Sequence, residues 1–404
     1  MRALLIMLCL VVAGCRERAA TTAAAPVRFE PQARPLAKTA ARDPKVVVRA
    51  SGDVFALIAR PGPAGADAVV LQSSDHGDHF SQVAILNQVP GEVMSHGETA
   101  PRLLLGPRSE FYAVWTASDG LKVSRSLTYG RSFEPPVIAV ADAPSFYTAG
   151  IAPDGTLLLA WLGTAPGKPK GAPGTTHLNV AASKDRGVTF EVLPGVATDV
   201  CPCCRPAIVA DASGRWYLAW RAVSTSSVRD MVAAVSADRG QSWSPPVPVS
   251  ADGWKINGCP HSGPALQVAG TRLHIAWYSE AEGAGRTYWT RSPLESLAFE
   301  PRRLLSAGVK DANHPVLAAE AETVWAAFQG RDAKEREGWG APAIYVRQLR
   351  DDAPAPLPAP RGTGSASHPE LKSLGAGRWL VAWSDQGEES TQAVTARFRV
   401  QAIR

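Results

Sequence analysis

The stretch Ser73-Ser-Asp75-His-Gly77-Asp-His-Phe80 returns twice with one pattern, Ser-x-Asp-x-Gly-x-x-aromatic, as Ser183-Lys-Asp185-Arg-Gly187-Val-Thr-Phe190 and Ser236-Ala-Asp238-Arg-Gly240-Gln-Ser-Trp243. Weaker copies begin at Ser126 and Ser292. The five serines are 53, 57, 53 and 56 residues apart. Self-similarity at a regular spacing predicts a fold assembled from one supersecondary unit repeated along the chain.

Each position of this pattern suits a tight turn between two strands. The Asp carboxylate can accept hydrogen bonds from backbone N–H groups two or three residues ahead, and Gly can adopt the positive φ of a sharp corner. The aromatic side chain can fill the space beneath the turn. We therefore assign these positions a structural role and expect no function from them.

A second repeat consists of short apolar strands, most of which end in Trp or Phe. It counts seven units: Phe55-Ala-Leu-Ile58, Tyr112-Ala-Val-Trp115, Leu158-Leu-Ala-Trp161, Tyr217-Leu-Ala-Trp220, His274-Ile-Ala-Trp277, Trp325-Ala-Ala-Phe328 and Leu380-Val-Ala-Trp383. The tryptophans are expected to pack between units. Because the repeats cover nearly all of the 404 residues, the sequence predicts a single all-β domain. The net charge is +5 without a basic run, so no nucleic-acid partner is expected.

The Ser-x-Asp-x-Gly-x-x-aromatic copies resemble the Asp boxes of the sialidase superfamily and related β-propellers. The resemblance extends over most of the chain. It implies a propeller of four-stranded antiparallel blades, with the boxes on turns remote from the active site. Familiar sialidase domains have six blades, whereas the strand repeat counts seven units here. We therefore expect a seven-bladed propeller, with six blades as the alternative.

The ends of the chain are expected to close the ring. The last unit, which begins at His368, lacks the outer strand that follows a box elsewhere. Near the N-terminus, Arg28-Phe29-Glu30-Pro31 resembles Ser132-Phe133-Glu134-Pro135 and Ala298-Phe299-Glu300-Pro301, which follow boxes in the interior. The N-terminal segment would then supply the missing strand and remove the free sheet edges.

The first residues are predicted to be a bacterial lipoprotein leader. The apolar stretch Ala3–Val12 is too short to span a bilayer and is typical of a secretory signal. Val12-Ala13-Gly14-Cys15 resembles a lipobox, which implies a lipid anchor on Cys15 as the membrane partner; an ordinary signal peptide is the alternative. Arg16 after the cysteine implies sorting to the outer membrane. The expected division is a leader at 1–15, a flexible tether at 16–26 and the propeller at 27–404.

In a four-stranded antiparallel blade, the segment before the first strand lies on the face opposite the boxes, around the ring axis. We call this the axial face. Four basic residues there adjoin a proline that opens a strand, and we predict that they bind a ligand: Arg102, Arg205, His314 and His368. Arg205, His314 and His368 each immediately precede their proline, so we expect them to occupy equivalent places around the ring. Salt bridges that fix a loop are the alternative for the arginines, and strand caps for the histidines. A second equivalent set, three residues before such a proline, contains Glu98, Cys203 and His261.

The predicted mature fold contains four cysteines, all on the axial face: Cys201, Cys203, Cys204 and Cys259. In an exported protein an even number suggests two disulfides, and a strained bridge between adjacent Cys203 and Cys204 is the least favoured pairing. The alternative is a soft metal ion, copper(I) or zinc, bound by these thiols and His261. The spacing of Cys201 and Cys204 also allows a redox role.

Sialidases hold the substrate carboxylate with three arginines and use a Tyr–Glu pair as nucleophile and an Asp as acid/base. The nearest matches implied for the three arginines are Arg49, Arg102 and Arg205. Those implied for the nucleophile pair are Tyr147, or Tyr278 with Glu280. The Phe/Tyr-Arg-Ile-Pro element that introduces the first arginine in that family is absent. The resemblance therefore extends to fold and repeats but not to the catalytic set.

The sequence thus predicts an exported, lipid-anchored propeller that acts as a binding or interaction module through a Cys/His/Arg cluster on its axial face. Its partner would be a carbohydrate or an envelope protein, and its cofactor, if any, copper or zinc. The alternative is an exo-sialidase-like glycoside hydrolase acting on acidic sugars.

Overall fold

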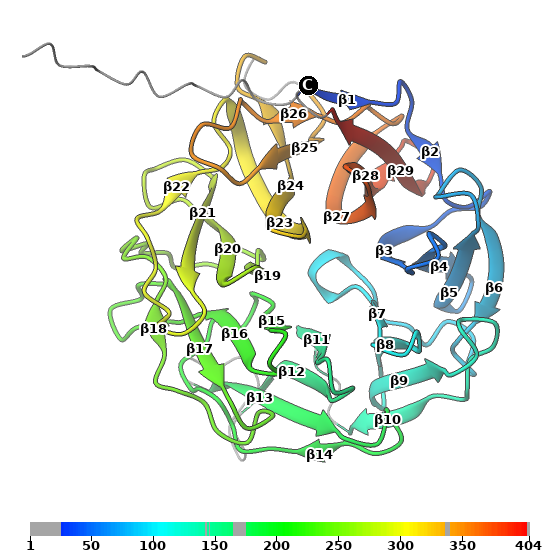
Figure 1. Cartoon of the computed structure of the whole chain (residues 1–404), viewed down its shortest axis with the longest axis horizontal. Helices are drawn as coiled ribbons and strands as arrows, with labels where there is room; N and C mark the ends of the chain where they lie inside the picture. The colour runs from blue at the N-terminus through cyan, green and yellow to red at the C-terminus, as the bar shows by residue number, and fades with distance from the viewer. Residues whose placement is uncertain (1–25, 142–143, 145, 165–174, 336–339, 402–404) are drawn as a thin grey trace, which may run out of the picture.

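The computed structural model describes residues 26–141, 144, 146–164, 175–335 and 340–401. Within these residues the strands form seven antiparallel sheets arranged in a ring (Figure 1). The one helix in this part of the chain is the short 3₁₀ helix η1 (Gly97–Thr99). The prediction of an all-β, seven-bladed propeller is confirmed, and the six-bladed alternative is wrong.

Each blade places its first strand at the centre of the ring and its fourth at the rim (Figure 1). The first three blades comprise β3 (Arg42–Val48), β4 (Val54–Gly62), β5 (Gly65–Ser73), β6 (Ser81–Ile85); β7 (Arg102–Leu105), β8 (Phe111–Ala117), β9 (Gly120–Ser126), β10 (Val137–Val140); and β11 (Tyr147–Ile151), β12 (Leu157–Thr164), β13 (Thr176–Ser183), β14 (Glu191–Val192).

The next three blades comprise β15 (Ala207–Ala210), β16 (Trp216–Arg221), β17 (Met231–Ser236), β18 (Val247–Pro248); β19 (Ala265–Ala269), β20 (Arg272–Ser279), β21 (Arg286–Pro293), β22 (Arg303–Leu304); and β23 (Val309–Glu320), β24 (Thr323–Asp332), β25 (Ala343–Gln348), β26 (Leu357–Pro358). The seventh blade joins the two ends of the chain: β27 (Ser365–Gly375), β28 (Arg378–Gln386), β29 (Thr391–Val400), β1 (Val27–Phe29) and β2 (Arg34–Pro35).

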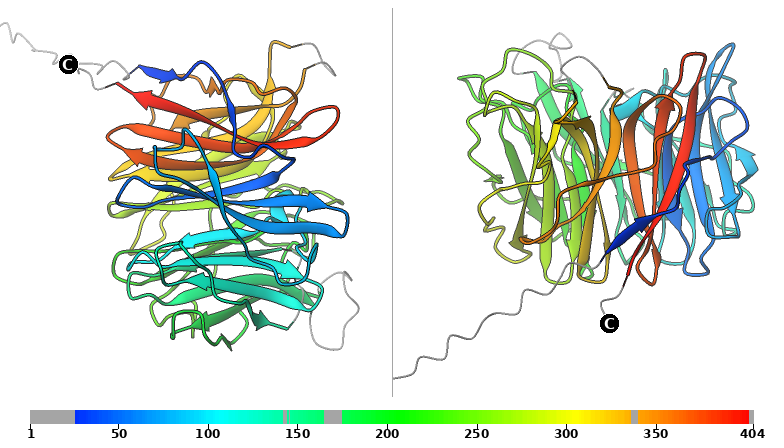
Figure 2. Two further views of the ribbon diagram at one scale, coloured as in Figure 1. Left: turned by 90° about the vertical axis from the view of Figure 1, so that its right-hand side faces the viewer. Right: turned by 90° about the horizontal axis from the view of Figure 1, so that it is seen from above.

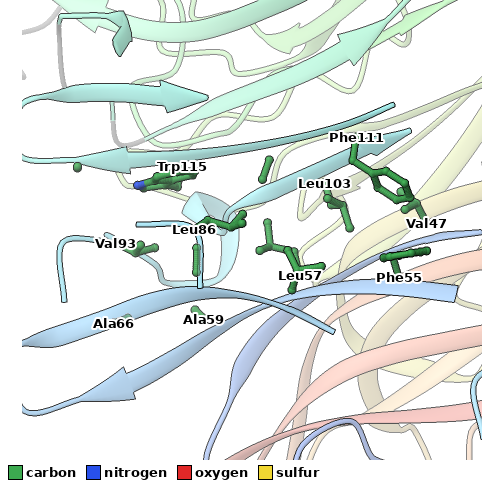
Figure 3. Close-up of a cluster of buried hydrophobic side chains, with 14 residues drawn as sticks. Val47, Phe55, Leu57, Ala59, Ala66, Leu86, Val93, Leu103, Phe111 and Trp115 are labelled. Atoms are coloured by element: carbon green, nitrogen blue, oxygen red, sulfur yellow. The ribbon is translucent and has the colours of Figure 1, made fainter. Parts of the chain in front are cut away.

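The hydrophobic core consists of layers between neighbouring blades. Every residue of β8 is buried, because a middle strand is covered on both faces by the adjacent blades. Between the first two blades, the rings of Phe55 and Phe111 pack at an interplanar angle of 51° with centroids 4.5 Å apart, and Trp115 is fully buried in the same cluster as Leu57 (Figure 3). Burial of each such side chain stabilises the fold by roughly 1.5–3 kcal/mol.

The repeated Ser-x-Asp-x-Gly segments form the turns between the third and fourth strands. In the turn after β13, the N–H of Gly187 donates to Ser183 Oγ at 2.8 Å, and the N–H of Thr189 donates to Asp185 Oδ1 at 3.0 Å. Arg186 and Gly187 have φ values of 63° and 79°, and Gly is the residue that adopts such angles without strain. Equivalent bonds to the serine form at Gly77, Gly130 and Gly240. These turns therefore shape the face opposite the axial face.

The N-terminal strand closes the ring as predicted. β1 pairs with β29 in antiparallel register, with Val27 opposite Val400 and Phe29 opposite Phe398. The two phenyl rings lie 5.1 Å apart. Side views show β1 lying along β29 where the ends of the described chain meet (Figure 2). Pairing of the two ends leaves no gap between the last blade and the first.

The expected leader at 1–15, including Cys15, and all of the tether at 16–26 except Pro26 lie outside the described residues. No helix in the described part of the chain has the length and apolar character needed to cross a bilayer.

Candidate functional site

The first strands carry an unusual residue just before their opening proline. Asp43, His314 and His368, in three adjacent blades, have φ values of 54°, 50° and 51° and precede Pro44, Pro315 and Pro369. The strand register shifts at each place, which marks a bulge. Residues other than glycine rarely adopt a positive φ, and a following proline further disfavours helical backbone angles. The three residues are therefore held in place by their surroundings.

Those surroundings are polar side chains from the neighbouring blades. The backbone N–H of Asp43 donates to Ser384 Oγ at 2.8 Å, that of His314 to Ser262 Oγ at 3.2 Å, and that of His368 to Gln329 Oε1 at 2.8 Å. Each bond links one blade to the blade before it in the ring. The predicted equivalence of His314 and His368 is thus found, and Asp43 rather than Arg205 is their third member. The Asp43-Pro44 dipeptide was the signal in the sequence.

Glu98 is the residue that joins the axial side chains. It lies in η1, in the cyan loop before β7 that reaches toward the centre of the ring (Figure 1), and only 8% of it is exposed. Its Oε1 lies 3.0 Å from His314 Nδ1 and its Oε2 lies 3.4 Å from Arg205 Nε. The N–H of Gly263 also donates to Oε2, at 3.1 Å. Groups from three further blades therefore contact the carboxylate of Glu98.

The protonation of this carboxylate follows from its partners. Burial alone would raise the pKa of Glu98, but Arg205 and the hydrogen bond from His314 outweigh burial and hold that pKa well below its usual range. The imidazole rings of His314 and His368 have centroids 4.3 Å apart. Burial, and then the nearby His314, lower the pKa of His368 to about 4. His368 is therefore neutral near pH 7.

Two further basic groups, Lys45 and Arg102, lie beside Glu98. Lys45 Nζ lies 3.5 Å from Glu370 Oε2, yet burial lowers the pKa of Lys45 to about 8. Burial, and then Arg205, lower the pKa of Arg102 to about 10. The Nε atom of Arg102 is buried and has no hydrogen-bond partner among the described residues. A buried donor without an acceptor is costly, so this position favours an anionic group.

A small cavity opens beside these groups. It is about 20 Å³ in volume and is lined by Lys45, Glu98, Arg102, Arg205, His314 and His368 among others. That volume holds about one or two water molecules. All four predicted ligand-binding residues thus meet at one cavity together with Lys45 and Glu98. Asp43 adjoins them, because its Oδ1 accepts a hydrogen bond from the N–H of Gly97 at 3.2 Å. We call these seven residues the axial network: Asp43, Lys45, Glu98, Arg102, Arg205, His314 and His368.

Three thiols converge beside the axial network, in the loop between β14 and β15. The Sγ atom of Cys201 lies 3.6 Å from those of both Cys203 and Cys204, and the three Sγ atoms all lie within 4.8 Å of one another. All three side chains are buried. We call Cys201, Cys203 and Cys204 the inner set. Phe146 and Val223 pack against it and shield it from solvent.

The backbone and a guanidinium fix the inner set. The N–H of Cys201 donates to the carbonyl of Arg221 at 2.9 Å, so the loop extends the edge of β16. Arg229 Nη1 donates to Cys201 Sγ at 3.1 Å. Hydrogen bonding with Cys203 and Cys204, together with the charge of Arg229, lowers the pKa of Cys201. The same bonds raise the pKa of Cys203, and burial raises the pKa of Cys204.

A second group shares one of these thiols. The ligand atoms of Cys203, Cys259 and His261 also lie within 4.8 Å of one another. We call these three residues the outer set. Cys259 and His261 are exposed and lie in the loop between β18 and β19. All five residues predicted from the cysteine spacing therefore come together, from two loops that precede neighbouring blades.

The four cysteines are free thiols, and no disulfide joins them. The thiols adjoin the axial network, because Arg205 follows Cys204 directly and Gly263 of the second loop donates to Glu98.

Of the residues brought to sialidase-like roles, Arg102 and Arg205 meet at the axial cavity, but the others do not line it. Arg49 pairs with Asp53 at 3.2 Å and lies over the ring of Tyr129, a residue of a turn on the opposite face, so its place in the axial ring was wrong. The buried Tyr147 hydroxyl lies 3.1 Å from the carbonyl oxygen of Ala100, and burial raises its pKa. Tyr278 donates to Glu280, and burial, with that bond, raises the pKa of Tyr278 rather than lowering it.

No protein-family model and no curated protein matches the sequence. Solved structures match its fold. A protein of unknown function from Dyadobacter fermentans DSM 18053 aligns with a TM-score of 0.56 at 13% identity, over 93% of this chain and 99% of that chain. The polysaccharide lyase Uly1 aligns with a TM-score of 0.53 at 11% identity, over 90% of each chain. A Hadza microbial sialidase, Hz136, aligns with a TM-score of 0.46 at 15% identity, over 83% of this chain and 74% of that chain. The chain is a seven-bladed β-propeller, and at these identities the likeness is one of fold.

Proposed function

We propose that this protein is an exported, lipid-anchored propeller that binds one soft metal ion, copper(I) or zinc, on its axial face. The observation that carries the proposal is the inner set: three buried Sγ atoms within 4.8 Å of one another and not joined by a disulfide. Thiolate sulfur is the ligand that these two ions prefer.

The surroundings of the inner set support metal binding over a purely structural role. Three buried thiols contribute little to packing that three small apolar residues would not. Arg229 places a positive charge 3.1 Å from Cys201 Sγ, which offsets the negative charge that a metal–thiolate group accumulates. His261 and Cys259 add two more soft ligands next to Cys203. The sequence supports export, through the lipobox-like segment that ends at Cys15.

Metal content and a free-thiol count test this function. Mature protein purified without a histidine tag should contain one copper or zinc ion per chain, with its thiols reduced. The Cys201→Ser/Cys204→Ser variant should lose the ion, whereas the control variant His79→Ala, which changes an exposed histidine on the opposite face, should retain it. Wild-type protein without metal affinity and without free thiols would show that disulfides are formed instead.

Binding of an acidic ligand, such as an acidic sugar, is a second candidate function. The observation that favours it is Arg102, whose buried Nε has no acceptor, beside Lys45 and Arg205 at the axial cavity. A cavity of about 20 Å³ admits one anionic group from the mouth, not a sugar ring. Binding of glucuronic or sialic acid to the wild type but not to Arg102→Ala would support this role, and turnover of a fluorogenic sialoside would add the hydrolase activity.

A further inference from the structure

The inner and outer sets have one ligand in common. Cys203 belongs both to the group with Cys201 and Cys204 and to the group with Cys259 and His261. A metal ion held by the outer set is therefore already bonded to one ligand of the inner set. When the metal ion moves from one set to the other, it exchanges two ligands and keeps Cys203 as the third.

The two sets differ in access to solvent. Cys201 and Cys204 are fully buried and Cys203 is 4% exposed, whereas Cys259 and His261 are both exposed. Phe146 closes the buried side, since it packs against the three inner thiols, and its ring centroid lies 6.1 Å from that of His261. Ions from solution therefore meet the outer set first.

The two sets also differ in backbone anchoring. The inner loop is bonded to the last residue of β16 through Cys201, and to the segment that follows β16 through the N–H of Val223, which donates to the carbonyl of Asp199 at 2.8 Å. In the described part of the chain, no hydrogen bond holds the backbone of Cys259 or His261. His261 has a φ of 50°, an angle that costs a non-glycine residue energy. The outer ligands can therefore move away without disturbing a blade.

We infer that the two sets form a relay for copper(I): the outer set captures the ion and passes it through Cys203 to the inner set. This inference rests on the proposed metal-binding function and adds to it the identity of the ion and the direction of its movement.

The exchange balances without any change of oxidation state. On capture, copper(I) leaves the ligands that delivered it and forms bonds to the sulfurs of Cys203 and Cys259 and to a ring nitrogen of His261, while the two thiol protons are released to solvent. Transfer breaks the bonds to Cys259 and His261 and forms bonds to Cys201 and Cys204. The new bonds displace the protons of Cys201 and Cys204; one of them passes to the sulfur of Cys259 and the other is released to solvent. The final copper(I) has three sulfur ligands in place of two sulfurs and one nitrogen, and soft copper(I) favours that change.

Three ligands in each set favour copper(I) over zinc. Structural zinc sites are almost always tetrahedral, with four protein ligands. Among the described residues no fourth His, Cys, Asp or Glu atom lies within 4.8 Å of all three members of the inner set. A trigonal site closed by Phe146 and Val223 therefore suits an ion that accepts three thiolates.

Anaerobic stopped-flow transfer of copper(I) from its bicinchoninate complex tests the relay. In the wild type, we expect rapid uptake of one ion. The double variant Cys259→Ser/His261→Ala alters exposed side chains only, so its fold is preserved; it should still hold one ion with wild-type affinity, but take it up at least about tenfold more slowly. Cys204→Ser should take up copper at the wild-type rate and hold it about 10–100-fold more weakly. His79→Ala should resemble the wild type in both measurements.

The outcomes separate the relay from the underlying function. Uptake by the double variant at the wild-type rate would overturn the relay and leave metal binding intact. A tetrahedral zinc ion bound by all four cysteines of the wild type would also overturn the relay, because Cys259 would then be a permanent ligand. Failure of the wild type to bind either ion would contradict the proposed function itself. Cys203→Ser, which removes the shared ligand, should abolish both the fast uptake and the tight binding.

Discussion

Glu98 Oε1 lies 3.0 Å from His314 Nδ1, although the two residues are separated by 216 positions in the chain. The contact runs across the ring, from the loop before the second blade to the first strand of the sixth. The same carboxylate reaches Arg205 of the fourth blade. One buried charge thus links strands that no local interaction brings together.

Glu98→Gln should destabilise the protein by about 3–5 kcal/mol, because it leaves Arg205 buried without a compensating charge. Denaturant unfolding followed by tryptophan fluorescence measures the change. Glu282→Gln is the matched control: its carboxylate is 46% exposed and pairs with Arg302, so the loss should be about 1 kcal/mol or less. Equal losses in the two variants would mean that the axial network contributes nothing to the fold.

Acidification from pH 7 to pH 4 should weaken the fold through His368. Its pKa is about 4 in the folded protein and near 6.5 in the unfolded chain, so the unfolded chain binds more protons in this window and stability falls as pH falls. The groups around it are His314, Asp43, Glu98 and Lys45.

The loss assigned to His368 is about 3 kcal/mol, at about 1.4 kcal/mol for each pKa unit. The unfolding free energy of His368→Asn, measured from pH 7 to pH 4, should therefore decline less steeply than that of the wild type. His79→Ala, which changes an 87% exposed side chain, should keep the wild-type slope. A slope unchanged by His368→Asn would exclude this histidine as the cause.

Asp185→Ala should cost about 1–2 kcal/mol, because it removes the acceptor for Ser183 Oγ and for the N–H groups of Val188 and Thr189. Asp119→Ala, at a 50% exposed carboxylate in a different kind of turn, is the control and should cost less. Thermal unfolding distinguishes the two. If Asp185→Ala were neutral, the repeated aspartate would have no role in stabilising its turn.

A chain that begins after residue 30 should melt at a lower temperature than one that begins at Pro26. The shorter chain lacks β1, so Phe398 loses its contact with Phe29 and the Phe398–Val400 part of β29 is left unpaired, while β2 still pairs with Val394 and Thr395. We expect a loss of at least about 2 kcal/mol and a gain in aggregation. Calorimetry and light scattering of the two chains measure both effects. Identical melting temperatures would show that the ring is closed without β1.

The sequence by itself determined the repeated unit, the seven blades and the closing strand. Each of these features follows from a local sequence pattern: a turn signature at Asp185, an apolar strand that ends at Trp115, or a segment around Phe29 that resembles two segments in the interior of the chain. Such patterns can be counted along the chain because each unit folds against its immediate neighbours. The spacing of Cys201, Cys203 and Cys204 also predicted that their thiols would meet.

Only the tertiary structure decided which side chains meet across the ring. It placed Glu98 between Arg205 and His314, sent Arg49 to the opposite face, and made Cys203 common to two ligand sets. The physical reason is that these contacts join residues from different blades, and their distances depend on the curvature of the closed ring and on the bulges at Asp43, His314 and His368. No single repeat contains that information.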